Sequence, residues 1–143
     1  MKSFASSISI RAAAATVWAI LVDARGYPAW NTTVDRVDGR IALGETVTVH
    51  AKVSPRRAFP VKVKQFAPPS RMVWGSGMPF GLFKGERTFT VTPTGQDSVE
   101  FSMREGFTGI LAPLIGRTIP DLQPSFDEFA ACLKAKAEAG EGG

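Results

Sequence analysis

The sequence has little of the chemistry on which many enzyme sites depend. Its 143 residues include one cysteine, Cys132, and one histidine, His50. A single cysteine cannot form a disulfide within the chain, and a single histidine excludes metal sites that need two, so we expect neither a metal nor another cofactor. Gly75, Gly77 and Gly81 do not have the spacing of a dinucleotide-binding or P-loop motif.

Long apolar runs are also missing. No stretch approaches the roughly 20 apolar residues of a membrane helix, and the N-terminus lacks the continuous apolar core of a signal peptide. We therefore expect a cytoplasmic protein without stable membrane insertion. Hydrophobic residues make up 44% of the chain and charged residues 21%, which is typical of a globular protein. We predict a single domain over residues 1–138 and a flexible Gly-rich tail over residues 139–143.

The net charge of +4 has its main source in the middle of the chain. Basic residues alternate there with apolar ones, which is typical of a strand with one solvated face. A patch that attracts anions or a membrane is the alternative, and we expect no nucleic-acid partner. The basic residues of this segment are Lys52, Arg56, Arg57, Lys62, Lys64 and Arg71.

The spacing of the apolar residues predicts short helices near the N-terminus, followed by a meander of strands. Phe4–Ile10 alternates as a strand, Ala12–Val22 has helical spacing, and Tyr27–Asn31 suits a turn or second short helix. Short Pro- and Gly-containing connections between the later strands imply antiparallel pairing. These later strands are predicted over Val34–Arg40, Thr46–Val53, Ala58–Phe66, Arg71–Ser76, Gly85–Thr92 and Ser98–Phe107.

The C-terminal segment carries the longest helical pattern. Its apolar residues step by threes and fours from Ile115 to Ala137 and form one stripe. Because Pro124 lacks an amide donor, we expect the helix over Ile115–Glu138 to be kinked around residues 118–124. The economical packing places this stripe against the apolar face of a twisted sheet. We therefore predict an α+β fold in which six to seven antiparallel strands curve around the helix.

This order of elements resembles the helix-grip arrangement of the SRPBCC superfamily, which includes START, pollen-allergen-like and polyketide cyclase proteins. The likeness is carried by the stretches Val17–Asp23 and Tyr27–Asn31, and by Gly85–Pro93 and Met103–Gly109. It covers nearly the whole chain. The resemblance implies a deep apolar cavity between the sheet and the long helix, but it does not fix an activity, because the superfamily includes lipid carriers, hormone receptors and cyclases.

Aromatic stripes of this kind favour a solid core when the residues are considered alone, whereas the resemblance makes a cavity the preferred interpretation. We expect Trp74, Met103 and Phe126 to meet in this cavity, and Trp30 to pack against the open end of the sheet. The loop of residues 75–83 is rich in glycine yet carries apolar side chains, which suits a cavity mouth or lid. The residues predicted to contact a ligand are Trp30, Met72, Trp74, Met78, Phe80, Phe89, Phe101, Met103, Phe107, Leu122, Phe126 and Phe129.

Glu105 is the acidic residue on the apolar parity of the last predicted strand. Burial raises the pKa of a carboxyl group and suits it to acid–base chemistry, so Glu105 is the catalytic candidate. A structural bond to an arginine or a backbone amide is the alternative. His50 falls on the polar parity of its strand, and we expect it to be exposed and non-catalytic.

Three functions are compatible with these features. We favour a monomeric or homodimeric protein that binds a small apolar or aromatic molecule in the cavity. The alternative is a polyketide cyclase- or dehydratase-like enzyme that uses Glu105 as acid or base. A stress- or toxin-type protein that acts through its basic face is the third hypothesis.

Overall fold

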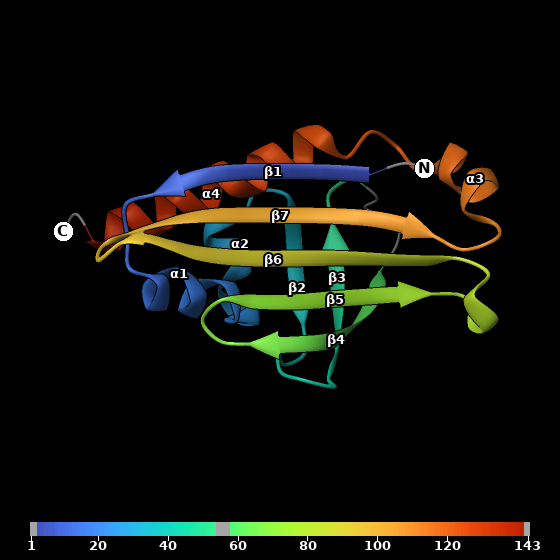
Figure 1. The fold of residues 1–143 in the computed structure, drawn as a ribbon, viewed down its shortest axis with the longest axis horizontal. Helices are drawn as coiled ribbons and strands as arrows, with labels where there is room; N and C mark the ends of the chain where they lie inside the picture. The colour runs from blue at the N-terminus through green and yellow to red at the C-terminus, as the bar shows by residue number, and fades with distance from the viewer. Residues whose placement is uncertain (1–2, 54–57, 142–143) are drawn as a thin grey trace.

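The fold is an α+β helix grip in which a seven-stranded antiparallel sheet curls around a long C-terminal helix, as predicted (Figure 1). A computed structural model describes residues 3–53 and 58–141. The strand order is β1-β7-β6-β5-β4-β3-β2, a meander whose last strand pairs with the first. The strands are β1 (Ser3–Ile10), β2 (Val34–Asp38), β3 (Thr46–Ala51), β4 (Phe59–Ala67), β5 (Arg71–Gly77), β6 (Lys84–Gly95) and β7 (Ser98–Thr108).

The sheet is strongly bent. Figure 1 shows β2 and β3 running steeply across the direction of β5, β6 and β7. The register shifts between Val34 and Arg36 on β2, and between Val63 and Gln65 on β4. Such bulges increase the local twist, and they let one sheet enclose a volume that a flat sheet would leave open.

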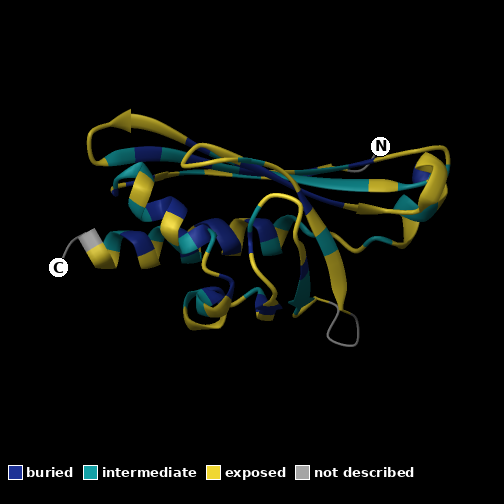
Figure 2. Cartoon of the chain, turned by 90° about the horizontal axis from the view of Figure 1, so that it is seen from below, coloured by how far each residue is buried: buried dark blue, intermediate teal, exposed yellow. Residues whose placement is uncertain are grey.

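The helices cover one face of the sheet. Figure 2 shows α4 beneath the long strands, with buried residues on both. Among the described residues, no helix is both long and apolar enough to cross a membrane. The α-helices are α1 (Ala14–Leu21), α2 (Tyr27–Trp30), α3 (Ala112–Ile115) and α4 (Gln123–Glu141), and the short 3-10 helices are η1 (Ala24–Gly26), η2 (Pro79–Gly81) and η3 (Gly116–Thr118).

The predicted disruption around residues 118–124 is confirmed, but it separates two helical segments instead of kinking one helix over Ile115–Glu138, because the chain leaves helical geometry completely between η3 and α4. Ile119 is extended, with φ −79° and ψ 124°. The helix restarts at Gln123, whose backbone N–H donates to Oδ1 of Asp121 at 3.1 Å. Pro124 then lies in the first turn of α4, where a missing N–H costs no helical hydrogen bond. At its other end α4 runs to Glu141, so residues 139–141 continue the helix.

The corner after η1 is tightly packed. Tyr27 is buried, and its hydroxyl donates to the backbone oxygen of Leu21 at 2.7 Å. Burial raises the pKa of Tyr27 far above its ordinary value. Trp30 is half-buried, with its ring 4.9 Å from that of Tyr27 and 5.5 Å from that of Phe129 on α4. Trp30 is therefore packed rather than exposed, and Tyr27 and Phe129 are its ring neighbours.

The basic segment of the middle strands is solvated where the structure describes it. Lys62 and Lys64 on β4 are exposed, and Nζ of Lys64 lies 3.5 Å from a carboxylate oxygen of Glu86. Arg56 and Arg57 lie outside the described residues.

Candidate functional site

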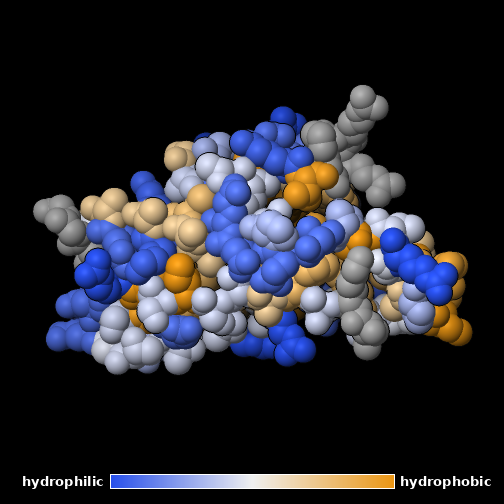
Figure 3. Space-filling view, turned by 90° about the horizontal axis from the view of Figure 1, so that it is seen from above, coloured by the Kyte–Doolittle hydropathy of each residue, from blue (hydrophilic) through white to orange (hydrophobic). Residues whose placement is uncertain are grey.

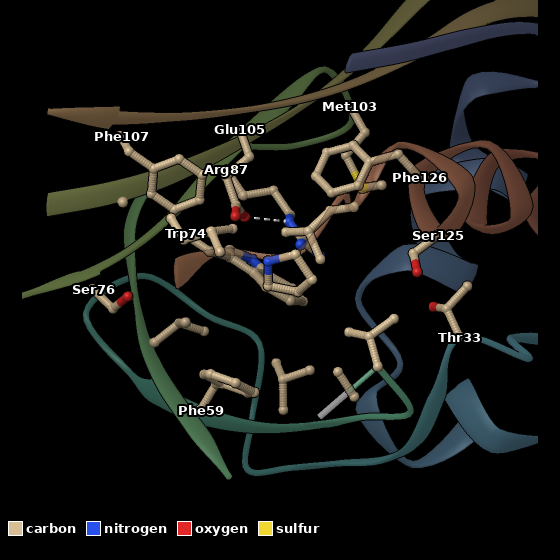
Figure 4. Close-up of a pocket in the computed structure, with 18 of the residues that line it drawn as sticks. Thr33, Phe59, Trp74, Ser76, Arg87, Met103, Glu105, Phe107, Ser125 and Phe126 are labelled. Carbon is tan, nitrogen blue, oxygen red and sulfur yellow. Dashed lines mark hydrogen bonds and ion pairs between the residues drawn. The ribbon is translucent and has the colours of Figure 1, made fainter. Parts of the chain in front are cut away.

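A cavity of about 390 Å³ lies between the concave face of the sheet and the segment that leads into α4 (Figure 4). Its wall is mainly apolar, with a polar minority made of Thr33, Ser76, Arg87, Glu105, Thr118 and Ser125. The remaining wall residues are Val34, Val49, Ala51, Val53, Phe59, Val61, Trp74, Phe83, Gly85, Met103, Phe107, Ile115, Ile119, Pro120, Leu122, Phe126 and Phe129.

Strand alternation explains which residues reach the cavity. Successive side chains of a strand point to opposite faces, so the odd-numbered residues of β6 and β7 share the concave face. Trp74 on β5 is the register partner of Arg87 on β6, and Arg87 is the partner of Glu105 on β7. The sheet thus places these three residues in one row across the wall.

An ion pair interrupts this apolar wall. Nε of Arg87 donates to Oε1 of Glu105 at 2.8 Å, and the two side chains are 25% and 16% exposed. The guanidinium carbon of Arg87 also lies 4.7 Å from the centre of the Phe126 ring. Figure 4 shows these side chains meeting near Trp74. Glu105 thus has the arginine partner that was the structural alternative to an acid–base role.

Trp74 is held in the wall by packing. Its side chain is buried, its ring lies 4.7 Å from that of Phe89, and its indole N–H has no hydrogen-bond acceptor among the described residues. An unpaired buried donor costs roughly 1–3 kcal/mol. Among the described residues, the indole N–H is thus an unpaired donor in the residue that borders the cavity.

A comparison with models of known protein families gives a match over most of the chain. The family model described as "Polyketide cyclase / dehydrase and lipid transport" matches residues 1–138. The chain belongs to this family. The match confirms the resemblance to the SRPBCC superfamily, whereas a comparison with curated proteins gives no match.

Solved structures of similar fold come from proteins with different roles. A START superfamily protein from Mycobacterium smegmatis is 17% identical, with 96% of this chain and 97% of that chain covered and a TM-score of 0.70. A norcoclaurine synthase point mutant from Thalictrum flavum is 15% identical, with coverages of 98% and 96% and a TM-score of 0.71. The Zhui aromatase/cyclase from a Streptomyces species is 12% identical, with coverages of 96% and 93% and a TM-score of 0.70. At these identities the likeness shows the fold alone.

In this member of the polyketide cyclase/dehydrase and lipid-transport family, six of the residues predicted to contact a ligand line the cavity. Trp74, Met103 and Phe126 share it, as expected. The full set of six is Trp74, Met103, Phe107, Leu122, Phe126 and Phe129.

Three other predicted residues are buried elsewhere in the core. Met72, Phe89 and Phe101 lie on the inward face but not on the cavity wall. The rings of Phe89 and Phe101 lie 6.0 and 6.1 Å from that of Phe129 on α4. The helix covers this part of the sheet, so the cavity is confined to the part nearer Phe107.

The loop expected to form the mouth contributes less than predicted. Met78 and Phe80 are exposed and do not line the cavity, and neither does Trp30. The loop contributes Ser76 and Phe83, and the ring of Phe83 stacks on that of Phe107 at 5.7 Å.

Arg87 is the main wall residue that the sequence analysis missed. Arg87 precedes Phe89 by two residues, so both side chains point to the same face of the strand. This alternation was sufficient to place Arg87 on the inward face of the sheet. The segment Ile115–Pro120 was missed for a different reason. It was assigned to a continuous helix, and its irregular path is what brings Ile115, Thr118, Ile119 and Pro120 to the cavity.

His50 lies outside the cavity wall. It is half-buried rather than exposed, and its Nε2 is 2.9 Å from Oδ2 of Asp38. Among the described residues, no three histidine, cysteine, aspartate or glutamate side chains are grouped so that they can hold a metal ion.

Proposed function

We propose that this protein binds a small apolar or aromatic molecule that carries an uncharged oxygen acceptor. The observation that carries this proposal is an apolar cavity of about 390 Å³ whose wall is interrupted by the Arg87–Glu105 pair. Ligand sites in proteins have volumes of roughly 300–1,000 Å³ and a few placed polar groups. The family's description, which includes lipid transport, is consistent with an apolar ligand.

The ion pair indicates the polar chemistry of the ligand. Arg87 uses Nε for Glu105, and a guanidinium has further N–H donors. Because the Glu105 carboxylate already balances the arginine, a ligand carboxylate would add a second negative charge in a poorly solvated site. A ketone, ester or amide oxygen accepts from Arg87 without adding charge.

Three naphthalene compounds of similar size test this proposal by calorimetry. They are acetylnaphthalene, its isopropenyl isostere without the oxygen, and naphthoate, each substituted at the same ring position. We expect the ketone to bind about tenfold more tightly than the isostere, since a hydrogen bond to a charged donor contributes about 1.5–3 kcal/mol. Naphthoate should bind most weakly.

Two arginine variants locate the binding site. Arg87→Met should abolish the advantage of the ketone, whereas Arg104→Met, on an exposed residue of β7, should leave it unchanged. Failure of all three compounds to bind, or equal effects of the two variants, would contradict the proposal. The cytoplasmic location and the monomeric or homodimeric state remain predictions.

A cyclase- or dehydratase-like activity is the second candidate function. The Glu105 carboxylate supports it, because it lies in the cavity wall. Turnover of a synthetic polyketide thioester, followed by mass spectrometry, tests this candidate. Glu105→Gln should then reduce turnover by roughly 10² or more, while acetylnaphthalene binding by the same variant controls for loss of the cavity.

A further inference from the structure

Two loops at one end of the sheet carry the largest concentration of exposed apolar side chains. Phe80 is 98% exposed, Ile110 is 78% exposed and Leu114 is 63% exposed. Figure 1 places η2 and α3 at the same end of the molecule, and Figure 3 shows apolar surface at that end. We call this surface the apolar tip, made of Met78, Phe80, Leu82, Ile110 and Leu114.

The backbone holds the two loops together. The N–H of Leu111 donates to the backbone oxygen of Leu82 at 2.8 Å. Gly109 has a φ of +111°, and a Cβ atom at this position would lie 2.6 Å from the same oxygen. Met78 N–H also donates to the backbone oxygen of Phe83 at 2.8 Å, which closes the first loop. The apolar tip is thus a built surface rather than two independent loops.

Phe80 combines a strained backbone with an exposed aromatic side chain, a combination that has no evident use for a protein that contacts only water. Its φ of 61° lies in the left-handed region, which is sterically unfavourable for a bulky side chain. The strained backbone does not place the ring in the core, because the side chain is almost fully exposed. A backbone strain that holds an aromatic ring in the solvent indicates a binding partner that covers the ring.

The charges around the tip favour an anionic surface. Lys84 and Arg117 are the charged residues of segments 77–85 and 106–120, and the carboxylates of Glu86, Glu105 and Asp121 lie just beyond these segments in the sequence. Lys84 also lies 3.8 Å from Glu86 on β6, whereas Arg117 is exposed beside α3. Basic residues beside apolar ones complement the phosphates and acyl chains of a bilayer interface.

The tip is continuous with the cavity. Phe83 follows the first loop, and Ile115 ends α3 in the second segment, and both line the cavity wall. A flat surface placed against this end therefore lies next to one boundary of the cavity. This geometry favours a bilayer, whose acyl chains adapt to projecting side chains. A rigid protein partner would instead need a pocket for each of these side chains.

We propose that the apolar tip docks peripherally on a phospholipid bilayer, with Phe80 and Ile110 entering the interface and Arg117 near the headgroups. The proposal goes beyond ligand binding in solution and does not depend on which molecule the cavity holds. Phe80 and Ile110 do not line the cavity, so their variants separate the two functions.

Vesicle flotation tests the proposal with the full chain. The vesicles contain phosphatidylcholine alone or phosphatidylcholine with phosphatidylserine. The variant Phe80→Ser/Ile110→Ser should bind both about tenfold or more weakly than the unsubstituted protein, because a factor of ten corresponds to only about 1.4 kcal/mol of lost apolar transfer. Arg117→Ser should weaken binding mainly to the vesicles that contain phosphatidylserine.

Leu43→Ser is the matched control, because Leu43 is a 63%-exposed leucine in the loop between β2 and β3. It should leave vesicle binding unchanged, and all variants should keep the melting temperature and acetylnaphthalene affinity of the unsubstituted protein. Absence of vesicle binding, or an equal loss with Leu43→Ser, overturns the proposal. It is also overturned if the tip variant instead converts a dimer to a monomer in sedimentation without lipid, which would assign the tip to a second copy of the chain.

Discussion

Arg87 and Glu105 are register partners on β6 and β7, and their side chains form a 2.8 Å ion pair in the wall of a mainly apolar cavity. The neighbouring inward positions on the two strands are Gly85, Phe89, Met103 and Phe107, none of which is polar. The guanidinium also lies over the ring of Phe126. The pair therefore links both strands and α4 at one point of the cavity.

Removing the charge of Glu105 should destabilise the protein. We expect Glu105→Gln to lower the free energy of unfolding by about 1–3 kcal/mol, because Arg87 then has no compensating charge in a largely desolvated position. Glu86→Gln is the control, since Glu86 pairs with Lys64 on the more exposed side of the same sheet and should contribute less than about 1 kcal/mol. Urea unfolding measures both, and equal losses would contradict the structural importance of the inner pair.

Filling the cavity should be tolerated, whereas the same substitution in the packed core should not. Met103→Trp places a larger side chain on the cavity wall and should block acetylnaphthalene with little change in melting temperature. Met72→Trp makes the same change at a buried position off the wall, and overpacking there should cost about 1–3 kcal/mol. Equal destabilisation by both substitutions would indicate that no space exists beside Met103.

The contact between the residues that end β1 and the C-terminal half of α4 should make the stability of the protein depend on acid. The Lys134 ammonium, with the backbone N–H of Arg11, lowers the pKa of Glu138 from 4.5 to about 2. Because the folded pKa lies below the unfolded pKa, this stabilisation is present above pH 4.5 and is lost as pH falls toward 2. We expect Glu138→Gln and Lys134→Met each to flatten the pH dependence of unfolding in this window. An unchanged profile in both variants would contradict the assignment.

Pro124 should have little effect on stability despite lying in a helix. Its position in the first turn of α4 requires no amide donor, so Pro124→Ala should change the free energy of unfolding by less than about 1 kcal/mol. Ala131→Pro, at an exposed interior position of the same helix, should cost about 3 kcal/mol or more. Circular dichroism during thermal unfolding measures the two variants, and a large loss for Pro124→Ala would show that the proline sets the start of the helix.

Much of the fold follows from local patterns. Alternation in β7 places Val99, Phe101, Met103 and Glu105 on one face whatever the neighbours are, because a strand has a side-chain period of two. The short turns between strands leave little choice other than an antiparallel meander. The C-terminal stripe likewise requires an apolar partner surface, and the sheet provides it.

The sequence by itself determined the order of the elements, the inward face of each long strand and the presence of one acid on that face. Only the tertiary structure decided that this acid pairs with Arg87, because the partner depends on the register between two strands. It also decided that Phe101 is packed core while Met103, two residues away, borders a cavity. Both face the same side, and the difference arises because α4 starts at Gln123 and its Phe129 covers only part of the sheet. Alternation specifies a face, whereas the extent of a cavity depends on where another element ends.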